Sequence, residues 1–363
     1  MLRQDWKGGA SMNMGDPRQK KHSESDFYQK AYESGYNFVN GMGFWSVDPK
    51  EAQRRRIMAT SGHLALCMLL YVFLRGYAAT PSLQIIQRYF RAELPQNAQM
   101  FYQFTVMVSD ILCLMVPCLL YLALDHIPKR AVFPHRHVAP YKIVCSVSMV
   151  LSVSVVVMLC SQFSSILISW FHIVPIGIQE VIPSNPGAMA VYVIHNTIIL
   201  AFFEELAFHG AVMQSLRRYS DVFALVASSM VYALMHLNPA RIFSSFILSL
   251  CTGFFVLYTG SLWTGIFSHC ALGILVIIQT IITDYLAMDL CTIIFCLFSC
   301  VVLIAGLISF MRLCKTDDNL FSFQNRGEYL KNSQRFGAFL STPGMVIALI
   351  VLIFLCVQFV QVI

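Results

Sequence analysis

Long apolar runs alternate with short polar segments along most of the 363-residue chain. An α-helix needs about 20 apolar residues to cross the hydrocarbon core of a bilayer, and it satisfies its own backbone hydrogen bonds there. The runs therefore predict an all-α, polytopic transmembrane bundle of about eight or nine spans. The predicted helices cover residues 60–80, 100–124, 142–170, 189–216, 221–237, 242–259, 263–283, 290–312 and 344–362.

The distribution of polar residues divides the chain into four parts. Residues 1–59 are polar, and we expect a loosely ordered tail that ends in a short basic helix. Residues 60–186 hold the first membrane helices, and residues 187–285 hold the core helices that carry the candidate chemistry. Residues 286–363 hold the last helices, with a polar loop at 313–343 between them.

Composition and charge support the same class. Apolar residues make up 57% of the chain and charged residues only 12%, about half of what a soluble domain carries. The formal net charge of +6 lies largely in the tail and loops, which indicates membrane orientation and not nucleic-acid binding. Arg54, Arg55 and Arg56 precede the first predicted helix, so the positive-inside rule predicts a cytoplasmic N-terminus, and we expect the plasma membrane.

Two adjacent carboxylates, Glu204 and Glu205, interrupt the apolar run at 189–216. A charged side chain at the centre of a membrane helix costs at least about 2.5–3.5 kcal/mol, so such residues are functional-site candidates. Neighbours on a helix point about 100° apart, so the two carboxylates cannot share a face. Glu205 can meet His209 one turn later, which predicts a structural pair and leaves Glu204 facing another element. The alternative is that neighbouring helices simply satisfy both carboxylates.

The first predicted helices carry little other chemistry. Asp110 is a lone acid in the second predicted helix, and Arg75 stands near the end of the first. Because buried ions usually pair, we expect a structural ion pair between them.

Two later helices each carry a stripe of polar or small residues at intervals of four, which places each stripe on one helix face. The stripes are Ser228, Tyr232 and His236 on one helix, and Gly265, His269 and Gly273 on the other. Each stripe alone is typical of ordinary helix packing. Two histidines on separate helices and an acid pair on a third together favour a shared polar cavity.

Such a set of side chains can hydrolyse an amide without a covalent intermediate. A carboxylate in an apolar cavity becomes a usable base near neutral pH, and one histidine can orient the water that it activates. A second histidine can stabilise the oxyanion that forms when this water attacks a carbonyl. Glu204, His236 and His269 could also ligate zinc, although the chain lacks the HExxH motif and the spacing does not require a metal.

Three ordered motifs resemble those of the CAAX protease and bacteriocin-processing (CPBP) family of intramembrane proteases. The motifs are Glu204-Glu205-xxx-His209-Gly210, Tyr232-xxx-His236 and His269-xxx-Gly273. The resemblance implies that Glu204 and His236 activate the water, that Glu205 steadies the helix, and that His269 assists at the oxyanion. It also implies a membrane-presented or lipidated peptide as substrate, in contact with membrane lipid.

The motifs depart from the family pattern at three positions. His209 replaces an arginine, which makes its pair with Glu205 weaker and dependent on pH. Tyr232 replaces a phenylalanine, and Gly273 replaces an asparagine that would donate to the oxyanion. Loss of such a donor typically costs about 2.7–4 kcal/mol in the transition state. Ser268 and Tyr232 are candidate replacements for it.

Two other functions are compatible with these residues. Gly273 and His209 are also compatible with a non-catalytic membrane adaptor or a bacteriocin self-immunity protein of the same fold. Glu204, His236 and His269 could instead form the proton relay of a coupled carrier.

Overall fold

A computed structural model describes most of the chain, and its residues form two compact units, Met1–Arg56 and Ile57–Ile363. The described residues are 36–39, 43–46, 48–79, 84, 96–169, 173–175, 182–324, 329–357 and 360–362. In the first unit, β1 (Tyr36–Val39) and β2 (Gly43–Ser46) pair as an antiparallel hairpin. Most of the predicted polar tail lies outside the described residues.

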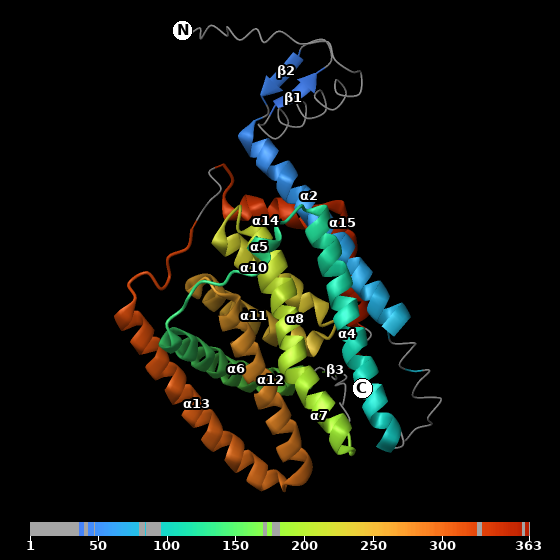
Figure 1. Ribbon diagram of the computed structural model, residues 1–363, viewed down its shortest axis with the longest axis vertical. Helices are drawn as coiled ribbons and strands as arrows, with labels where there is room; N and C mark the ends of the chain where they lie inside the picture. The colour runs from blue at the N-terminus through green and yellow to red at the C-terminus, as the bar shows by residue number, and fades with distance from the viewer. Residues whose placement is uncertain are drawn as a thin grey trace. The chain divides into compact units, whose positions relative to one another are not determined.

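Helices make up nearly all of the second unit (Figure 1). In chain order they are α2 (Pro49–Phe73, which begins in the first unit), α4 (Gln96–Leu124), α5 (Lys129–Val132), α6 (Pro140–Ser169), α7 (Pro186–Ile194), α8 (Leu200–Glu205), α9 (Met213–Leu216), α10 (Asp221–Met235), α11 (Pro239–Thr259), α12 (Leu262–Tyr285), α13 (Met288–Thr316), α14 (Asn332–Leu340) and α15 (Pro343–Val357). Three π-helical stretches are η1 (Leu74–Ala79), η2 (His195–Ile199) and η3 (Leu206–Val212). Two short strands, β3 (Ile173–Pro175) and β4 (Val360–Val362), pair antiparallel.

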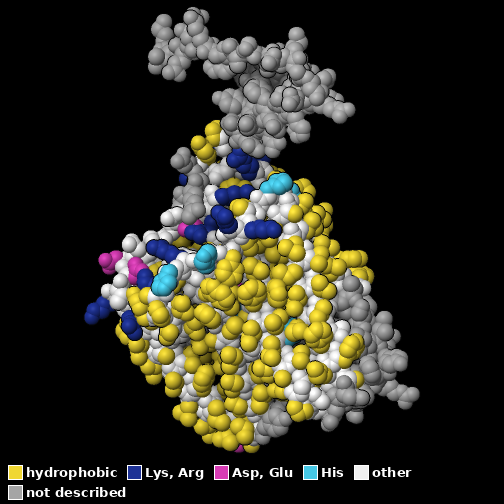
Figure 2. All heavy atoms as spheres, viewed as in Figure 1, with side chains coloured by type: hydrophobic (Ala, Val, Ile, Leu, Met, Phe, Trp, Pro, Cys, Tyr) yellow, Lys and Arg dark blue, Asp and Glu magenta, His cyan; other side chains and the backbone are white. Residues whose placement is uncertain are grey.

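The predicted fold class, an all-α membrane bundle, is confirmed. Seven helices of the described residues are long and apolar enough to cross a membrane, or up to eight if a bent pair counts as one span. Hydrophobic side chains cover a broad surface of the second unit, with Lys and Arg gathered along one border (Figure 2). The chain is therefore an integral membrane protein.

Two of the nine predicted helices differ from full spans. The helix predicted at 221–237 is α10, which has only 15 residues because Asn238-Pro239 follows it. At 1.5 Å per residue it covers about 22 Å, less than the ~30 Å hydrocarbon core. The helix predicted at 344–362 is α15, which forms the bent pair with α14 at an angle of 73°.

Ion pairs and backbone bonds connect several helix ends, and we call this part of the second unit the basic end. Arg218, which follows α9, bonds Asp125 at the end of α4, with 2.6 Å between Nη2 and Oδ2. Arg217 bonds Asp221 at the start of α10, with 2.9 Å between Nε and Oδ1. The backbone nitrogen of Arg136 donates to the carbonyl of Gly260, which follows α11. These contacts fix which end of each helix faces the polar border.

The hydrophobic core lies where α2, α9, α10, α12 and α15 meet. Met213, Phe223, Leu262 and Leu352 are fully buried there and belong to one cluster. Against this core, the segment Pro186–Leu216 runs as a single apolar span made of α7, η2, α8, η3 and α9. The core thus holds in place the helix that carries the acid pair.

Candidate functional site

The acid pair lies at the end of α8, between the two π-helical stretches η2 and η3. π-Helical turns are rare and frequently occur at functional sites. Glu205 is 3% exposed, and its Oε2 lies 2.7 Å from Nδ1 of His209, so the predicted contact is present. His209 is also buried, and its Nε2 lies 3.1 Å from both the carbonyl oxygen and the hydroxyl of Ser249 on α11. This buried pair fixes η3 against α11.

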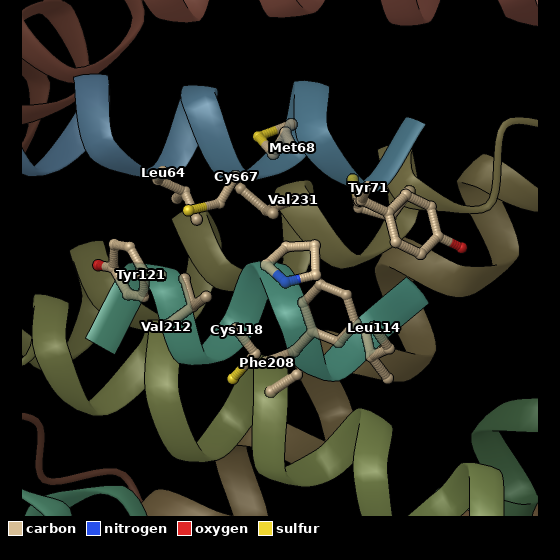
Figure 3. A pocket seen from close by; sticks show the side chains of 13 residues that line it. Leu64, Cys67, Met68, Tyr71, Leu114, Cys118, Tyr121, Phe208, Val212 and Val231 are labelled. Atoms are coloured by element: carbon tan, nitrogen blue, oxygen red, sulfur yellow. The ribbon is translucent and has the colours of Figure 1, made fainter. Parts of the chain in front are cut away.

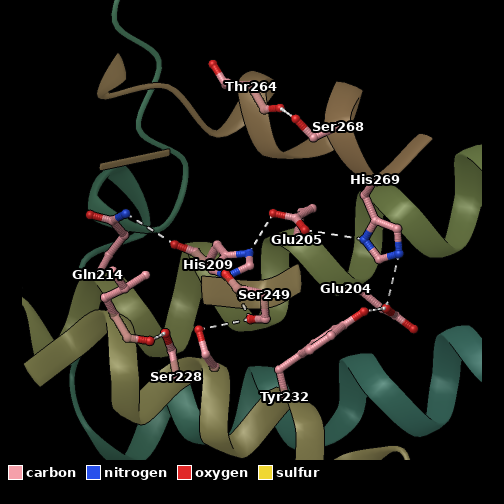
Figure 4. A network of polar contacts seen from close by, with 12 residues as sticks. Glu204, Glu205, His209, Gln214, Ser228, Tyr232, Ser249, Thr264, Ser268 and His269 are labelled. Atoms are coloured by element: carbon pink, nitrogen blue, oxygen red, sulfur yellow. Dashed lines mark hydrogen bonds and ion pairs between the residues drawn. The ribbon is translucent and has the colours of Figure 1, made fainter. Parts of the chain in front are cut away.

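The imidazole of His269, on α12, joins the two carboxylates (Figure 4). Its Nδ1 lies 3.3 Å from Oε1 of Glu205, and its Nε2 lies 3.6 Å from Oε2 of Glu204. A protonated imidazole would donate a hydrogen bond to Glu205 and form an ion pair with Glu204, because both of its ring nitrogens carry a proton. The carboxylates diverge on their own helix, as predicted, but a side chain from another helix links them.

Tyr232 and His236, at the end of α10, complete the second side of the site. The Tyr232 hydroxyl donates to Oε2 of Glu204 at 3.1 Å, and its ring packs edge-on against His236 with 4.8 Å between centroids. Nδ1 of His236 lies 3.0 Å from the backbone carbonyl oxygen of Tyr232. A carbonyl can only accept, so Nδ1 carries the proton and Nε2 of His236 is left as an acceptor.

One cavity of about 510 Å³ brings the predicted residues together. The side chains of Glu204, His236 and His269 all line it, as do Tyr232 and Gly273. Among the described residues, no direct hydrogen bond joins His236 to Glu204, and the cavity has room for water, which occupies about 30 Å³ per molecule in the liquid. Because α10 is short, His236 lies about 22 Å from the start of that helix and not at the far side of a full span.

A second pocket, between α2, α4, η3 and α10, lacks such chemistry (Figure 3). Its volume is about 40 Å³, and none of the residues that line it is an acid, a histidine or a cation. Leu64, Leu114, Phe208 and Val231 are among its walls. The polar cavity is therefore the candidate site.

Two glycines of the predicted stripe allow close packing around this cavity. A Cβ on Gly265 would collide with the carboxylate of Glu205. A Cβ on Gly273 would lie 2.7 Å from the carbonyl oxygen of Asn196 and 3.0 Å from the Cα of Thr197, so η2 occupies the space of a side chain there. The family's asparagine therefore cannot be introduced at 273 unless η2 moves.

Asn196 is a cavity residue that the sequence motifs did not identify. It lines the cavity, and its Nδ2 donates to the carbonyl of Tyr192 at 2.9 Å, which leaves a second amide hydrogen. Ser268, considered as a replacement donor, is fully buried and donates to the carbonyl of Thr264, and it does not line the cavity. In the sequence, Asn196 could have been identified as an amide side chain within the same mainly apolar run that carries the acid pair.

The residues do not fit a zinc ion as they are placed. Zinc requires several His, Cys, Asp or Glu ligands at about 2.0–2.3 Å around one point. In the part of the chain that the structure describes, no group of three or more such side chains could hold a metal.

A second ionic group, partly exposed, lies outside the residues that line the cavity. Asp110 pairs with Arg75, as expected, and its Oδ2 lies 3.5 Å from Nε2 of the buried His195. The pair joins α4 to the π-helical end of α2 and to η2, which is a structural arrangement.

Comparison with known proteins gives one match. Residues 186–275 match the family model described as "Type II CAAX prenyl endopeptidase Rce1-like", a segment that contains Glu204, His236 and His269. No curated protein and no solved structure matched the chain. At the level of the family, the match indicates a CAAX-type intramembrane protease that acts on a peptide at a membrane. The predicted resemblance to the CPBP family of intramembrane proteases is thus confirmed over residues 186–275.

Proposed function

We propose that this protein is an intramembrane endopeptidase that hydrolyses a membrane-presented or lipidated peptide with a water activated by Glu204. The observation that carries the proposal is the convergence of Glu204, His236 and His269 on one cavity within a bundle of membrane helices. Three polar side chains from three apolar helices are expensive to place there without a functional reason.

The cavity offers a role for each group. A water between Glu204 and His236 would donate one proton to the carboxylate and one hydrogen bond to Nε2 of His236. As its oxygen attacks the peptide carbonyl, protonated His269 stabilises the oxyanion. When the C–N bond breaks, Glu204 returns the proton to the leaving amine. Glu205 is a positioning residue, because it holds His269 and His209.

Asn196 offers a donor in place of the asparagine that the family carries at position 273. Asn196 lines the cavity, and its backbone carbonyl lies against Gly273, whose missing side chain lets η2 approach. The amide hydrogen that Tyr192 does not accept would be available to an oxyanion in the cavity. We therefore include Asn196 among the oxyanion donors, together with His269.

The family description supports a substrate class for this proposal. A C-a-a-X sequence ends a chain and carries a prenyl group on its cysteine, so the substrate would be a lipid-anchored C-terminal tail. Arg54, Arg55 and Arg56 near the start of α2 support a cytoplasmic N-terminus, and we propose the plasma membrane as location.

The test compares Glu204→Gln with the exposed control Glu51→Gln in purified protein. The substrate is a farnesylated peptide that ends in C-a-a-X, and cleavage is followed by mass spectrometry. We expect Glu204→Gln to lower kcat by about 10²–10⁴-fold, because it removes the general base, while the control stays unchanged. Equal turnover of Glu204→Gln and wild type would overturn the proposal.

A non-catalytic adaptor is the second candidate, and Gly273 is the observation that favours it. The family's side-chain donor is absent at this position and cannot be added without moving η2. The adaptor hypothesis predicts that the wild-type protein binds the peptide and never cleaves it. It also predicts that Asn196→Ala leaves binding unchanged, whereas the protease hypothesis predicts slower cleavage.

A further inference from the structure

One face of α11 forms a wall of the polar cavity. The residues on this face recur at intervals of three and four, as expected for a single helix side. They are Arg241, Ser244, Ser245, Leu248, Ser249 and Thr252. The wall thus carries one guanidinium followed by a row of hydroxyl groups that ends beside the buried His209.

Arg241 lies far from the basic end. Gly260 lies at that end, and 19 residues of helix separate it from Arg241, which corresponds to about 28 Å. The 15 residues of α10 give a similar separation of about 22 Å from Asp221. Arg241 is therefore the first residue of the candidate span Arg241–Thr259 and lies at the end of α11 opposite Gly260.

Among the residues that the structure describes, Arg241 has no ion-pair partner. Its backbone nitrogen donates to the carbonyl of Asn238, and its own carbonyl accepts from the Ser244 hydroxyl, but its exposed guanidinium forms no ion pair. By contrast, Arg75 and Arg218 each pair with an aspartate. Of the residues that line the cavity, Arg241 is the one Lys or Arg.

We propose that Arg241 binds the free C-terminal carboxylate of the substrate, with the hydroxyls of Ser244 and Ser245 beside it. A guanidinium forms two parallel hydrogen bonds to a carboxylate, and a tail that ends in the cavity supplies the missing negative charge. The inference builds on the proposed function and adds the part of the substrate that this wall recognises.

The length of the subsite agrees with this assignment. Eight residues of α11 separate Arg241 from Ser249, which contacts the His209–Glu205 pair, so the distance along the helix is about 12 Å. Three extended residues span about 10–11 Å. A C-a-a-X tail has three residues after its cysteine. With its terminal carboxylate on Arg241, a three-residue tail is long enough to place the bond after the cysteine near the level of Ser249.

The experiment crosses two peptides with two variants. The peptides are a farnesylated C-a-a-X peptide with a free carboxylate and the same peptide with a C-terminal carboxamide. For wild type, we expect kcat/KM to favour the free acid by about 10–100-fold, mainly through KM, because a charge-assisted pair is lost with the amide. Arg241→Met should remove this preference, so that kcat/KM becomes equal for the two peptides. Arg241→Lys keeps the positive charge but cannot form two parallel hydrogen bonds to a carboxylate, so it should retain part of the preference for the free acid.

Equal loss for both peptides in Arg241→Met and Arg241→Lys would overturn the subsite. Two further arms separate other sources of negative charge. In the first, the peptide ends in a carboxamide and has an aspartate before it; if Arg241 still favours this peptide, an acidic side chain is the ligand. In the second, cleavage is compared in nanodiscs of phosphatidylglycerol and of phosphatidylcholine; if the dependence on Arg241 changes with the lipid, a lipid phosphate is the ligand. Either result would overturn the C-terminal assignment.

Failure of the proposed function can be distinguished from failure of the subsite. If no Glu204-dependent cleavage occurs, binding of the same two peptides to Glu204→Gln protein still tests Arg241. A binding preference for the acid that Arg241→Met abolishes supports the subsite, and equal binding of both peptides by the Glu204→Gln protein overturns it.

Discussion

Two regions of this protein hold acidic side chains in opposite ways. In the cavity, Glu204 and Glu205 contact two imidazoles and a tyrosine hydroxyl and no Lys or Arg. At the basic end, Asp125 accepts from the guanidinium of Arg218 at 2.6 Å and from the Thr60 hydroxyl at 3.0 Å. Both regions bury carboxylates, but only the cluster around Asp125 includes a permanent cation.

The difference indicates which charges can take part in chemistry. An arginine remains protonated at every physiological pH, so its pair with Asp125 keeps one state and fastens α4 to the end of α9. An imidazole can gain or lose a proton in this range, so the groups around Glu204 can exchange protons during a reaction. The carboxylates that form no ion pair with a permanent cation, Glu204 and Glu205, are the ones that line the cavity.

The largest expected effect follows the removal of Glu205. Glu205→Gln removes the buried acceptor shared by His209 and His269, and removal of one partner of a buried pair typically costs about 3–5 kcal/mol. We expect a large fall in the free energy of unfolding, measured by urea denaturation in detergent micelles, together with loss of cleavage. Unchanged stability would show that the two imidazoles do not depend on this carboxylate.

Asp125→Asn should separate the two regions. The variant loses charge-assisted hydrogen bonds at the basic end, which we expect to lower the free energy of unfolding by about 1–3 kcal/mol. Cleavage per folded molecule should stay at the wild-type level, because Asp125 lies outside the cavity. A variant that folds normally but no longer cleaves would remove the distinction between the regions.

A pair of glycine variants tests how tightly the cavity network is packed. A Cβ on Gly253 would lie 2.9 Å from Nε2 of His209 and 2.7 Å from Cδ1 of Leu225, so Gly253→Ala should cost about 1–3 kcal/mol and slow cleavage. Gly337, on α14, has nothing within 4 Å of such an atom. Gly337→Ala should stabilise the protein by up to about 1 kcal/mol. The measurement is the thermal unfolding midpoint of each variant, which we expect to fall for Gly253→Ala and to rise for Gly337→Ala.

The sequence was sufficient for the features that depend on periodicity. Apolar runs located seven of the membrane helices, and the spacing of four placed His209 on Glu205. Burial in a membrane leaves few polar residues, so those that remain are conspicuous. For this reason Glu204, His236 and His269 could be selected from one chain, and the structure places them around one cavity.

The rest depends on how helices meet, which local pattern does not encode. The link from His269 to both carboxylates needs α12 to cross α8 at one level, and the approach of Asn196 depends on a glycine in another helix. The short α10, which sets the depth of His236 and Arg241, follows from a proline, but its apolar composition resembles that of a full span. The contacts of His269 and Asn196 therefore depend on tertiary packing, which the sequence pattern does not give.

The smallest effect is expected at Asp317, which contacts Tyr258 two residues before Gly260, and it depends on pH. Asp317, after α13, accepts from the ammonium of Lys142 at 2.6 Å and from the Tyr258 hydroxyl at 2.9 Å, and these bonds hold its pKa below the usual range. A lowered pKa contributes stability above the unfolded value, about 3.9, and this contribution disappears as pH falls through the lowered value.

Asp317→Asn should therefore lower the free energy of unfolding by less than about 1 kcal/mol at pH 7, because the pair is partly exposed. The difference between variant and wild type should shrink as the pH falls below about 4, where the wild-type carboxyl also gains a proton. Thermal midpoints recorded from pH 3 to pH 7 measure this trend. A difference that stays constant over the range would mean that Asp317 acts through its shape and not its charge, unlike the ion pairs on which the comparison with the cavity depends.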